Sequence, residues 1–500
     1  MTGISIKSLW VLRAGMPCHA PGQKDTGMTT QLTEEDTSIH EHIHDYIGEL
    51  RQRAEGIEIL EPGTGTTRYS HDAATAKTAA SSGNPGPAVV LPTTTAEVQA
   101  AVKLAAELGV TVVPRGAGTG LSGGATAHMD QIVISTEKLT RIVEVSPLDE
   151  VAVVEPGVIN ADLNRHLEPF GLFYAPDPAS FDISSIGGNI ATNAGGLRCA
   201  KYGVTRESVL SLDVVLPNGS LITVGHRSIK GVTGLDLTSL FVGSEGILGI
   251  VTKATVRLRP IPVARKTVTA FFNSTAEGAE GLAAITLSPV RPAAIEFFDT
   301  PSLANIDAHS GTALRERGAA LILIEIDGYG IGDQAAHLAT ALTAAGGRVT
   351  VESDDDAVLL WELRRSGRGL PQDKWYIGED IAVPKSQLPK VYAAFPALEA
   401  RFGVAISAVS HAGDGNLHPL ITKDKTPDDG ANPPASLTDA ATELVKVALS
   451  LGGTVTGEHG VGTIKREWAA LELSERSRDV QHAIKAAIDP QQLLNPGKAI

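Results

Sequence analysis

The chain has few cysteines, few aromatic residues and no long apolar segment. Its 500 residues include 2 cysteines, Cys18 and Cys199, and 4% are aromatic. Two cysteines so far apart cannot supply a disulfide framework, so we expect a reducing, cytoplasmic environment. No apolar stretch approaches the ~18 residues that span a bilayer. We therefore expect no transmembrane segment, while peripheral attachment to a membrane stays open.

Basic residues are also scarce relative to acidic ones. The chain has 42 Lys and Arg against 57 Asp and Glu, which gives a formal net charge of −15. Nucleic-acid binding depends on basic contacts to phosphate, so we expect no nucleic-acid partner. The hydrophobic content of 42% is ordinary for a globular protein. At about 150 residues per domain, the length predicts about three domains.

Glycine, by contrast, is concentrated in a dense run at residues 114–124, which read Pro-Arg-Gly-Ala-Gly-Thr-Gly-Leu-Ser-Gly-Gly. The run follows a predicted strand, Val110–Pro114, and leads into another, Ile132–Ser135, rather than into a helix. This order argues against a Rossmann dinucleotide site. Glycine permits positive φ and leaves no Cβ, so successive N–H groups can form a concave nest for a pyrophosphate. The run therefore predicts a phosphate-binding loop.

A second run, residues 176–196, is dense in small residues, hydroxyl groups and amides. Such a segment can lie flat on a planar ring and donate hydrogen bonds to its heteroatoms. The alternative is a long irregular loop without a ligand. A structureless loop of this length is uncommon in a compact domain unless it is functional, so we expect a ligand-binding segment.

Two motifs late in the chain combine histidine, glycine and carboxylate. Residues 411–418 read His-Ala-Gly-Asp-Gly-Asn-Leu-His, and residues 457–460 read Gly-Glu-His-Gly. Borderline divalent metals bind imidazole nitrogen and carboxylate oxygen together. The histidines at the two ends of the first motif can fold back onto one ion, and Glu458 can supply a third ligand. Separate, unrelated histidines are the alternative.

The order of the remaining predicted elements indicates an α+β fold. A strand at Ala88–Leu91 precedes a helix with Thr94 as its N-cap and Gly109 at its C-terminal end. Further strands are predicted at Ile142–Val145, Val151–Glu155, Val251–Leu258, Val268–Phe271, Ala294–Phe298 and Ala320–Asp327. The tail from Thr438 is mostly helical, and the later strands read as an antiparallel sheet covered by helices.

Four motifs together resemble the flavoproteins of the vanillyl-alcohol oxidase / para-cresol methylhydroxylase (PCMH-type) family. They are the two glycine-rich runs, residues 243–252 (Gly-Ser-Glu-Gly-Ile-Leu-Gly-Ile-Val-Thr) and residues 495–498 (Asn-Pro-Gly-Lys). The sequence is most similar to the branch of glycolate oxidase D subunits, D-lactate dehydrogenases and D-2-hydroxyglutarate dehydrogenases. The resemblance implies a two-part PCMH-type FAD-binding domain, an antiparallel-sheet substrate (cap) domain and a helical C-terminal segment.

The expected boundaries follow from that resemblance. They are 1–30 for a disordered extension, 31–83 for an N-terminal helix and loop, 84–263 for the FAD-binding domain, 264–437 for the cap domain, and 438–500 for a segment returning to the FAD domain. Whether residues 1–28 belong to the mature protein stays open.

The resemblance also implies non-covalent FAD, because the first loop lacks the histidine that tethers the flavin in some relatives. The implied pyrophosphate contacts are Arg115, Gly116, Ala117, Gly118, Thr119, Gly120, Ser122 and Gly123. The implied flavin and ribityl contacts are Pro176, Asp177, Ser180, Gly187, Asn189, Asn193, Ile250, Asn495 and Lys498.

By the same resemblance, a divalent metal, expected to be zinc, is bound by His411, His418 and Glu458. His459 is the implied catalytic base, and Asn416 is an implied substrate contact. Arg364 is expected to bind the substrate carboxylate, because a planar guanidinium pairs with both carboxylate oxygens. The implied reaction oxidises a D-2-hydroxy acid to the 2-oxo acid, by metal-assisted proton abstraction and hydride transfer to flavin N5.

Two positions depart from the hydroxyglutarate branch, which has a threonine and a lysine where this chain has Arg368 and Gly378. The departure favours a smaller acid of the D-lactate or glycolate class. Arg368 could also bind a second negative group, so the larger diacid stays open. A non-catalytic flavin-binding partner subunit and a metal-independent flavin alcohol oxidase remain alternatives. A quinone, a cytochrome or a partner subunit could accept the electrons, and oligomeric state stays open.

Overall fold

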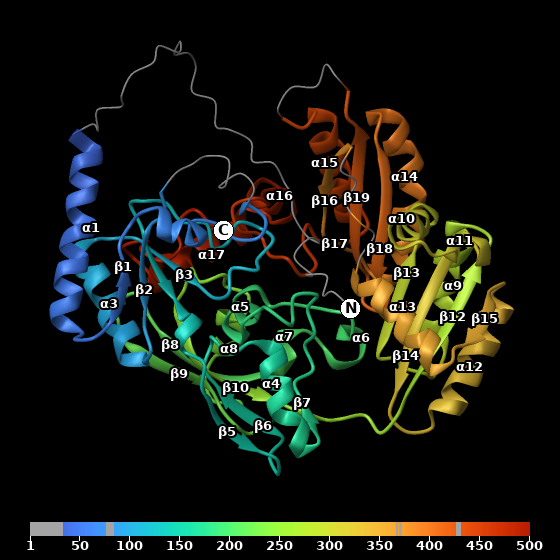
Figure 1. Ribbon diagram of the computed structural model, residues 1–500, viewed down its shortest axis with the longest axis horizontal. Helices are drawn as coiled ribbons and strands as arrows, with labels where there is room; N and C mark the ends of the chain where they lie inside the picture. Colours follow the sequence, from blue (N-terminus) through green and yellow to red (C-terminus); the bar gives the residue numbers. More distant parts are fainter. Residues whose placement is uncertain (1–33, 77–84, 367–368, 370–372, 427–431) are drawn as a thin grey trace.

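The structure, a computed structural model, describes residues 34–76, 85–366, 369, 373–426 and 432–500. The expected extension at 1–30 and Arg368 lie outside this part of the chain. Two lobes lie side by side, and the chain passes from the first to the second and then returns to the first (Figure 1). The returning helices are α16 (Arg466–Glu472) and α17 (Glu475–Ile488).

The first sheet begins the first lobe and leads into the glycine-rich loop. Its strands, in spatial order, are β1 (Glu58–Leu60), β2 (Ala88–Leu91), β4 (Ile132–Ser135) and β3 (Val112–Arg115). The last three pair in parallel and are almost wholly buried, as their continuous apolar sequences require. Helices α1 (Glu34–Arg53) and α3 (Thr95–Leu108) accompany this sheet. The Thr94 side chain accepts a hydrogen bond from Glu97 N, and Gly109 is left-handed, which confirms the predicted helix ends.

The second sheet completes the first lobe and is antiparallel. Its strands, in spatial order, are β5 (Ile142–Ser146), β6 (Val151–Val154), β10 (Ile250–Arg257), β8 (Val209–Val215) and β9 (Leu221–Gly225). The short strands β7 (Leu172–Phe173) and β11 (Arg259–Pro260) pair separately. The helices of this region are α4 (Asn160–Leu167), α5 (Ile186–Thr192), α6 (Cys199–Tyr202), α7 (Thr205–Ser208) and α8 (Leu237–Phe241).

The run at residues 176–196 is not irregular throughout, because helix α5 occupies its second half. The Ser185 side chain accepts a hydrogen bond from Gly188 N and so caps the helix, and Asn193 ends it in the left-handed conformation at φ 51°. The sequence left open a long irregular loop here, because a helix of about two turns is too short to produce a clear apolar period.

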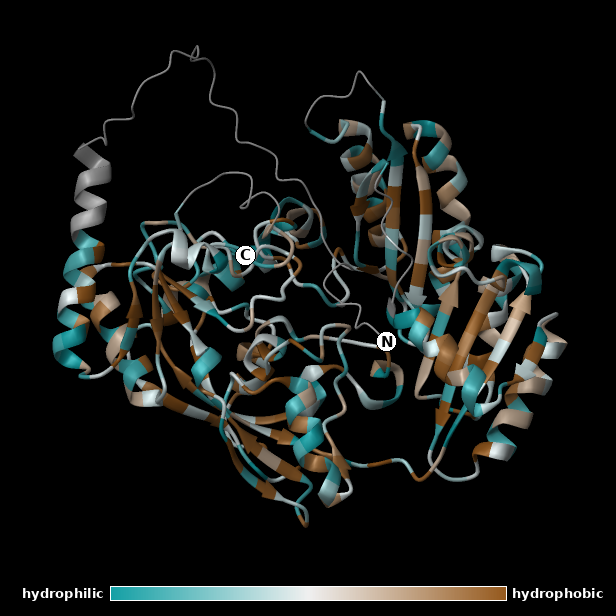
Figure 2. Cartoon of the chain, in the orientation of Figure 1, coloured by the Kyte–Doolittle hydropathy of each residue, from teal (hydrophilic) through white to brown (hydrophobic). Residues whose placement is uncertain are grey.

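The second lobe contains one antiparallel sheet of eight strands. Their spatial order is β15 (Arg348–Val351), β12 (Arg265–Phe272), β14 (Ala320–Asp327), β13 (Ala294–Phe298), β18 (Ala405–His411), β19 (Asn416–Asp424) and β16 (Lys374–Gly378), and β17 (Ile381–Ala382) also pairs with β19. Figure 2 shows the apolar strands between helices with polar outer faces. The α+β class with an antiparallel sheet in this lobe is confirmed.

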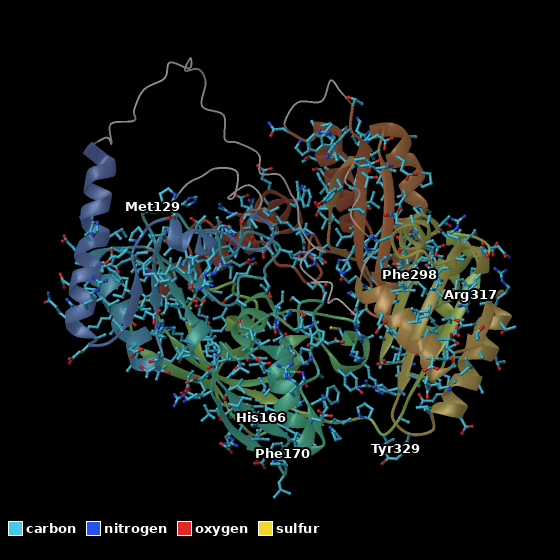
Figure 3. All side chains as sticks on the ribbon, in the orientation of Figure 1. Met129, His166, Phe170, Phe298, Arg317 and Tyr329 are labelled. Carbon is cyan, nitrogen blue, oxygen red and sulfur yellow. The ribbon has the colours of Figure 1, made fainter. Side chains whose placement is uncertain are left out.

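Helices cover both faces of the large sheet. The apolar cluster on one face includes residues of α9 (Thr275–Leu287), α12 (Ile331–Ala344), α14 (Leu388–Phe402) and α15 (Ala435–Ser450). The cluster on the other face includes residues of α10 (Thr300–Ser310), α11 (Leu314–Arg317) and α13 (Asp354–Ser366). Phe298 belongs to this second cluster (Figure 3). The Arg317 guanidinium lies over the Phe271 ring, 4.4 Å from its centroid. Among the described residues, no helix is both long and apolar enough to cross a bilayer.

Candidate functional site

A cavity of about 490 Å³ lies between the glycine-rich loop, helix α5 and the side chains of Glu458 and His459. Many of the expected FAD contacts line it. These are Arg115, Gly116, Ala117, Gly118, Thr119, Gly120, Ser122, Ser180, Gly187, Asn189 and Ile250. Nine of the lining residues are glycines, and their backbone leaves room for a close ligand such as the pyrophosphate of FAD. The residues present therefore fit this cofactor.

Arg115 packs beneath the loop, and its guanidinium is occupied by hydrogen bonds to backbone carbonyl oxygens. Its side chain donates to the carbonyl oxygens of Arg68 at 3.0 Å and His71 at 2.6 Å. Gly118 has φ +74°, and a Cβ there would lie 2.0 Å from Arg115 Nη2. The arginine thus packs directly under the loop, and only glycine leaves space for it.

The other expected FAD contacts are not on the cavity wall. Pro176 O accepts from Asn160 Nδ2, and Asp177 forms an ion pair with Arg198 at 2.8 Å. Asn193 Oδ1 accepts from the backbone N–H of Arg206 at 2.9 Å. A Cβ at Gly123 would lie 2.2 Å from Thr463 Oγ1. These residues therefore shape the surroundings of the cavity.

Asn495 and Lys498 hold the far end of the loop. Asn495 Nδ2 donates to Gly124 O at 3.0 Å and to Glu245 O at 2.7 Å. Lys498 Nζ donates to Thr126 O and to Asn495 Oδ1. Burial lowers the pKa of Lys498 to about 8. The C-terminal motif thus links the chain end to the first glycine-rich run.

The turn that carries Glu458 and His459 is attached to the same loop. Ser122 Oγ donates to His459 O at 3.0 Å. Glu245 accepts the N–H groups of Val461 and Gly462, both at 2.8 Å. These contacts fix the turn against the first lobe and explain why its side chains reach the cavity.

The hairpin of β18 and β19 places both histidines of the first motif on one face of the sheet. His411 is opposite Asn416, and His418 is opposite Val409. Side chains two residues apart share a face, so His411, Asn416 and His418 point to the same side. The His411 and His418 ring centroids are 5.0 Å apart. No strand was predicted for these residues, so the hairpin that brings the two histidines together is a finding of the structure.

Glu458 completes a compact donor set with these histidines. Its Oε1 lies 3.3 Å from His418 Nε2 and 3.9 Å from His411 Nε2. One ligand atom from each residue lies within 4.8 Å of the others. Two imidazole nitrogens and one carboxylate oxygen are donors that zinc accepts, with a position left for substrate. The three residues therefore fit a divalent metal.

The surroundings of His411, His418 and Glu458 shift the pKa values of these three possible ligands in different directions. Burial lowers the pKa of His418 to about 4. Burial also opposes a charge on His411, but Glu296 outweighs it and raises the pKa to about 9. For Glu458, the hydrogen bond from His418 and the charge of His411 outweigh burial and lower the pKa to about 2. At pH 7 a metal would displace one proton, from His411.

Sequence reasoning did not find Glu296, which joins two expected site residues. It is 0% exposed, and its Oε1 lies 2.6 Å from His411 Nδ1 while its Oε2 accepts from Arg364 Nε. Arg364 Nη2 lies 3.4 Å from His411 Nδ1. Arg365, also missed, lines the cavity. A lone glutamate in an apolar strand does signal a buried partner, but not which one.

Comparisons with known proteins agree with the fold and the cavity. Residues 86–225 match the FAD binding domain family, and residues 261–499 match the family of FAD linked oxidases, C-terminal domain. The chain is 40% identical over 417 residues to glycolate oxidase subunit GlcD of Bacillus subtilis (strain 168), covering 82% of this chain and 88% of the relative. It is 35% identical over 415 residues to D-lactate dehydrogenase of Archaeoglobus fulgidus, covering 82% and 91%.

A solved structure shows the same fold. p-Cresol methylhydroxylase with substrate bound aligns at a TM-score of 0.71 and 18% identity, covering 94% of this chain and 97% of that one. The glycine-rich cavity and these relatives lead to one assignment. The chain is an FAD-dependent oxidoreductase with the PCMH-type fold, and it belongs to the family of FAD linked oxidases that includes the glycolate oxidase GlcD subunits and the D-lactate dehydrogenases.

Proposed function

We propose that the chain oxidises a small D-2-hydroxy acid, of the D-lactate or glycolate class, to the 2-oxo acid. The observation that supports this most strongly is that Glu458 and His459 lie between the cavity and the histidines of the β18–β19 hairpin. Both line the glycine-walled cavity, and both contact the buried His418. A substrate bound beside Glu458 and His459 would therefore contact both the flavin in the cavity and the histidines of the hairpin.

The proposed roles follow from the chemistry of each side chain. When bound, FAD supplies the hydride acceptor at N5, and a divalent metal, expected to be zinc, supplies Lewis-acid polarisation of the 2-hydroxyl. Arg364 binds the substrate carboxylate, and Glu296 fixes the guanidinium through Nε. His459 accepts the hydroxyl proton while the hydride leaves C2. His411, His418 and Glu458 hold the metal.

The names of the relatives support the substrate class and an external electron acceptor. One is named a glycolate oxidase subunit and another a D-lactate dehydrogenase. The word subunit supports a protein partner that takes the electrons from the reduced flavin, with a quinone or a cytochrome as the other candidates. We place the substrate among the small acids because Gly378 offers no polar side chain to a second carboxylate, unlike the residue that the hydroxyglutarate branch has there.

Replacing His459 by glutamine tests the proposed base. His459→Gln should retain FAD, because the loop contacts use the backbone of this turn. Flavin reduction by D-lactate or glycolate under anaerobic mixing should slow by about 10²–10⁴-fold. His482→Gln, an exposed histidine on α17, is the control and should react like the unaltered chain. Near-normal reduction in His459→Gln would remove this residue as the base.

A further inference from the structure

A buried carboxylate outside the expected site lies beneath the Gly-Glu-His-Gly turn. Asp380 stands between strands β16 and β17 and is 0% exposed. We propose that Asp380 is a positioning residue. It holds the backbone of the Gly-Glu-His-Gly turn in a curve, so that the Glu458 and His459 side chains point into the same site. The proposal deepens the proposed function and rests on it for the roles of those two residues.

Three successive backbone N–H groups converge on one oxygen of this carboxylate. Asp380 Oδ2 accepts from the N–H groups of Gly457 at 2.9 Å, Glu458 at 3.1 Å and His459 at 3.0 Å. Thr456 Oγ1 donates to the same oxygen at 2.7 Å. Converging N–H groups form a nest, and a nest requires a curved backbone.

The curvature of this turn brings the side chains of two neighbouring residues, Glu458 and His459, to the same side of the backbone. Adjacent side chains on an extended strand point to opposite faces, so Glu458 and His459 could not share a site there. Around Asp380 both turn toward His418. Glu458 Oε1 lies 3.3 Å from His418 Nε2, and the His459 ring stacks on the His418 ring at 5.4 Å and 16°. Gly457 allows the turn, since a Cβ there would lie 2.0 Å from Asn416 Nδ2.

The second oxygen of Asp380 reaches the other motif. Oδ1 accepts from Asn416 Nδ2 at 2.7 Å. One carboxylate therefore connects the histidine hairpin to the Gly-Glu-His-Gly turn, which follows it by about forty residues in sequence. Lys465 Nζ lies 3.9 Å from Oδ2 and donates to Asp380 O at 2.6 Å, which balances the buried charge.

These contacts also argue against Asp380 as a metal ligand. Asp380, His418 and His459 form a second compact group of possible ligands. However, Asp380 Oδ2 already accepts four hydrogen bonds, and its other oxygen accepts from Asn416. Oδ2 therefore has no lone pair left for a metal, and Oδ1 is engaged by Asn416, so we assign the effect of Asp380 on a metal to Glu458 and the turn.

The test compares Asp380→Asn with Glu379→Gln in the full-length, FAD-containing protein. Both changes convert a buried carboxylate into an amide, and Glu379 is the neighbour that pairs with Lys465 at 3.6 Å. Zinc binding is measured by calorimetry after chelation. Amide hydrogen exchange is measured on peptides spanning 456–462. Asp380→Asn should weaken zinc binding about 10–100-fold and speed exchange in those peptides at least tenfold.

Glu379→Gln should change neither quantity more than threefold. Equal effects from both variants, or an unchanged Asp380→Asn, would overturn the proposal. Thr456→Val removes one donor to the same oxygen and keeps the shape of the side chain, so it serves if Asp380→Asn does not fold. It should speed exchange severalfold, and an unchanged rate would contradict the proposal. If the unaltered chain binds no zinc and reduces no acid, the proposed function fails, while the exchange rates still decide the role of Asp380.

Discussion

Glu296 is the residue that couples the expected metal ligand to the expected substrate anchor. Its two oxygens are used by different partners, His411 and Arg364, and it has no exposed surface. A histidine that binds a metal through one nitrogen is usually fixed by a hydrogen bond from the other. The same carboxylate here also fixes the guanidinium, so a single change should disturb both functions.

Glu296→Gln should lower zinc affinity about 10–100-fold and raise the KM for the hydroxy acid, because both partners lose the charge that orients them. Calorimetry and steady-state kinetics measure the two effects. Glu352→Gln is the control, since Glu352 is a buried carboxylate that follows the edge strand β15 and pairs with Arg317 at 3.0 Å. A change in KM without a change in zinc affinity would separate the two roles and contradict the coupling.

The protonation of His411 makes a pH prediction. Its pKa of about 9 means that the free site holds a proton that a metal must displace, while His418, with a pKa of about 4, holds none. Zinc affinity should therefore rise about tenfold per pH unit between pH 6 and 8. Calorimetry in buffers of different ionisation enthalpy should show about one proton released per zinc at pH 7. No release would remove His411 as a ligand.

At the scale of the elements, the β18–β19 hairpin depends on its turn. Gly415 has φ +94°, and a Cβ there would lie 2.0 Å from Val383 O. Gly403, at the end of α14, has φ +61° with open space around it. The two glycines thus differ in crowding and not in the sign of φ.

Gly415→Ala should therefore destabilise the protein by about 2–3 kcal/mol, from strain and a shifted backbone, and should abolish zinc binding at micromolar concentrations. Gly403→Ala should cost about 1 kcal/mol and leave zinc binding unchanged. Urea unfolding and calorimetry give the two quantities. Equal destabilisation by both substitutions would show that the β18–β19 turn tolerates a side chain at Gly415 and that the hairpin does not depend on this glycine.

The sequence predicted those elements whose signals are local. The strand Ala88–Leu91 and the caps Thr94 and Gly109 are confirmed, because apolar runs and capping residues act within a few positions. Asp380 and Glu296 were missed because their partners lie far along the chain, and no short motif contains both. The bend that unites Glu458 and His459 also needed the structure, because Asp380, which holds it, lies 78 residues before Glu458 in the sequence.

At the scale of the whole molecule, helix α6 of the first lobe is joined to the large sheet by buried charges. Arg198 pairs with Asp177 in its own lobe and with Glu325 of β14, both at 2.8 Å. Lys201 and Tyr202 both bond to Asp327. The flavin cavity and the histidine hairpin belong to different lobes, so their relative position depends on this interface.

Arg198→Ala should destabilise the protein by about 3 kcal/mol, because it leaves the buried Glu325 and the partly buried Asp177 without their partner. FAD should stay bound, since the loop contacts are untouched, but anaerobic flavin reduction should slow. Lys253→Ala is the control and should cost less than about 1 kcal/mol, since its pair with Asp213 lies at the surface of the first lobe. An unchanged reduction rate in Arg198→Ala would show that this interface does not align the two halves of the site.

The most direct test of the proposed activity is anaerobic flavin absorbance of the FAD-loaded chain mixed with paired D- and L-2-hydroxy acids, before and after chelation. We predict bleaching by D-lactate or by glycolate, none by L-lactate, loss of bleaching on chelation and its return with zinc or manganese. Bleaching that survives chelation would point to a metal-independent flavin alcohol oxidase. No bleaching by any acid, with flavin bound, would contradict catalysis by this chain alone and favour a non-catalytic partner subunit.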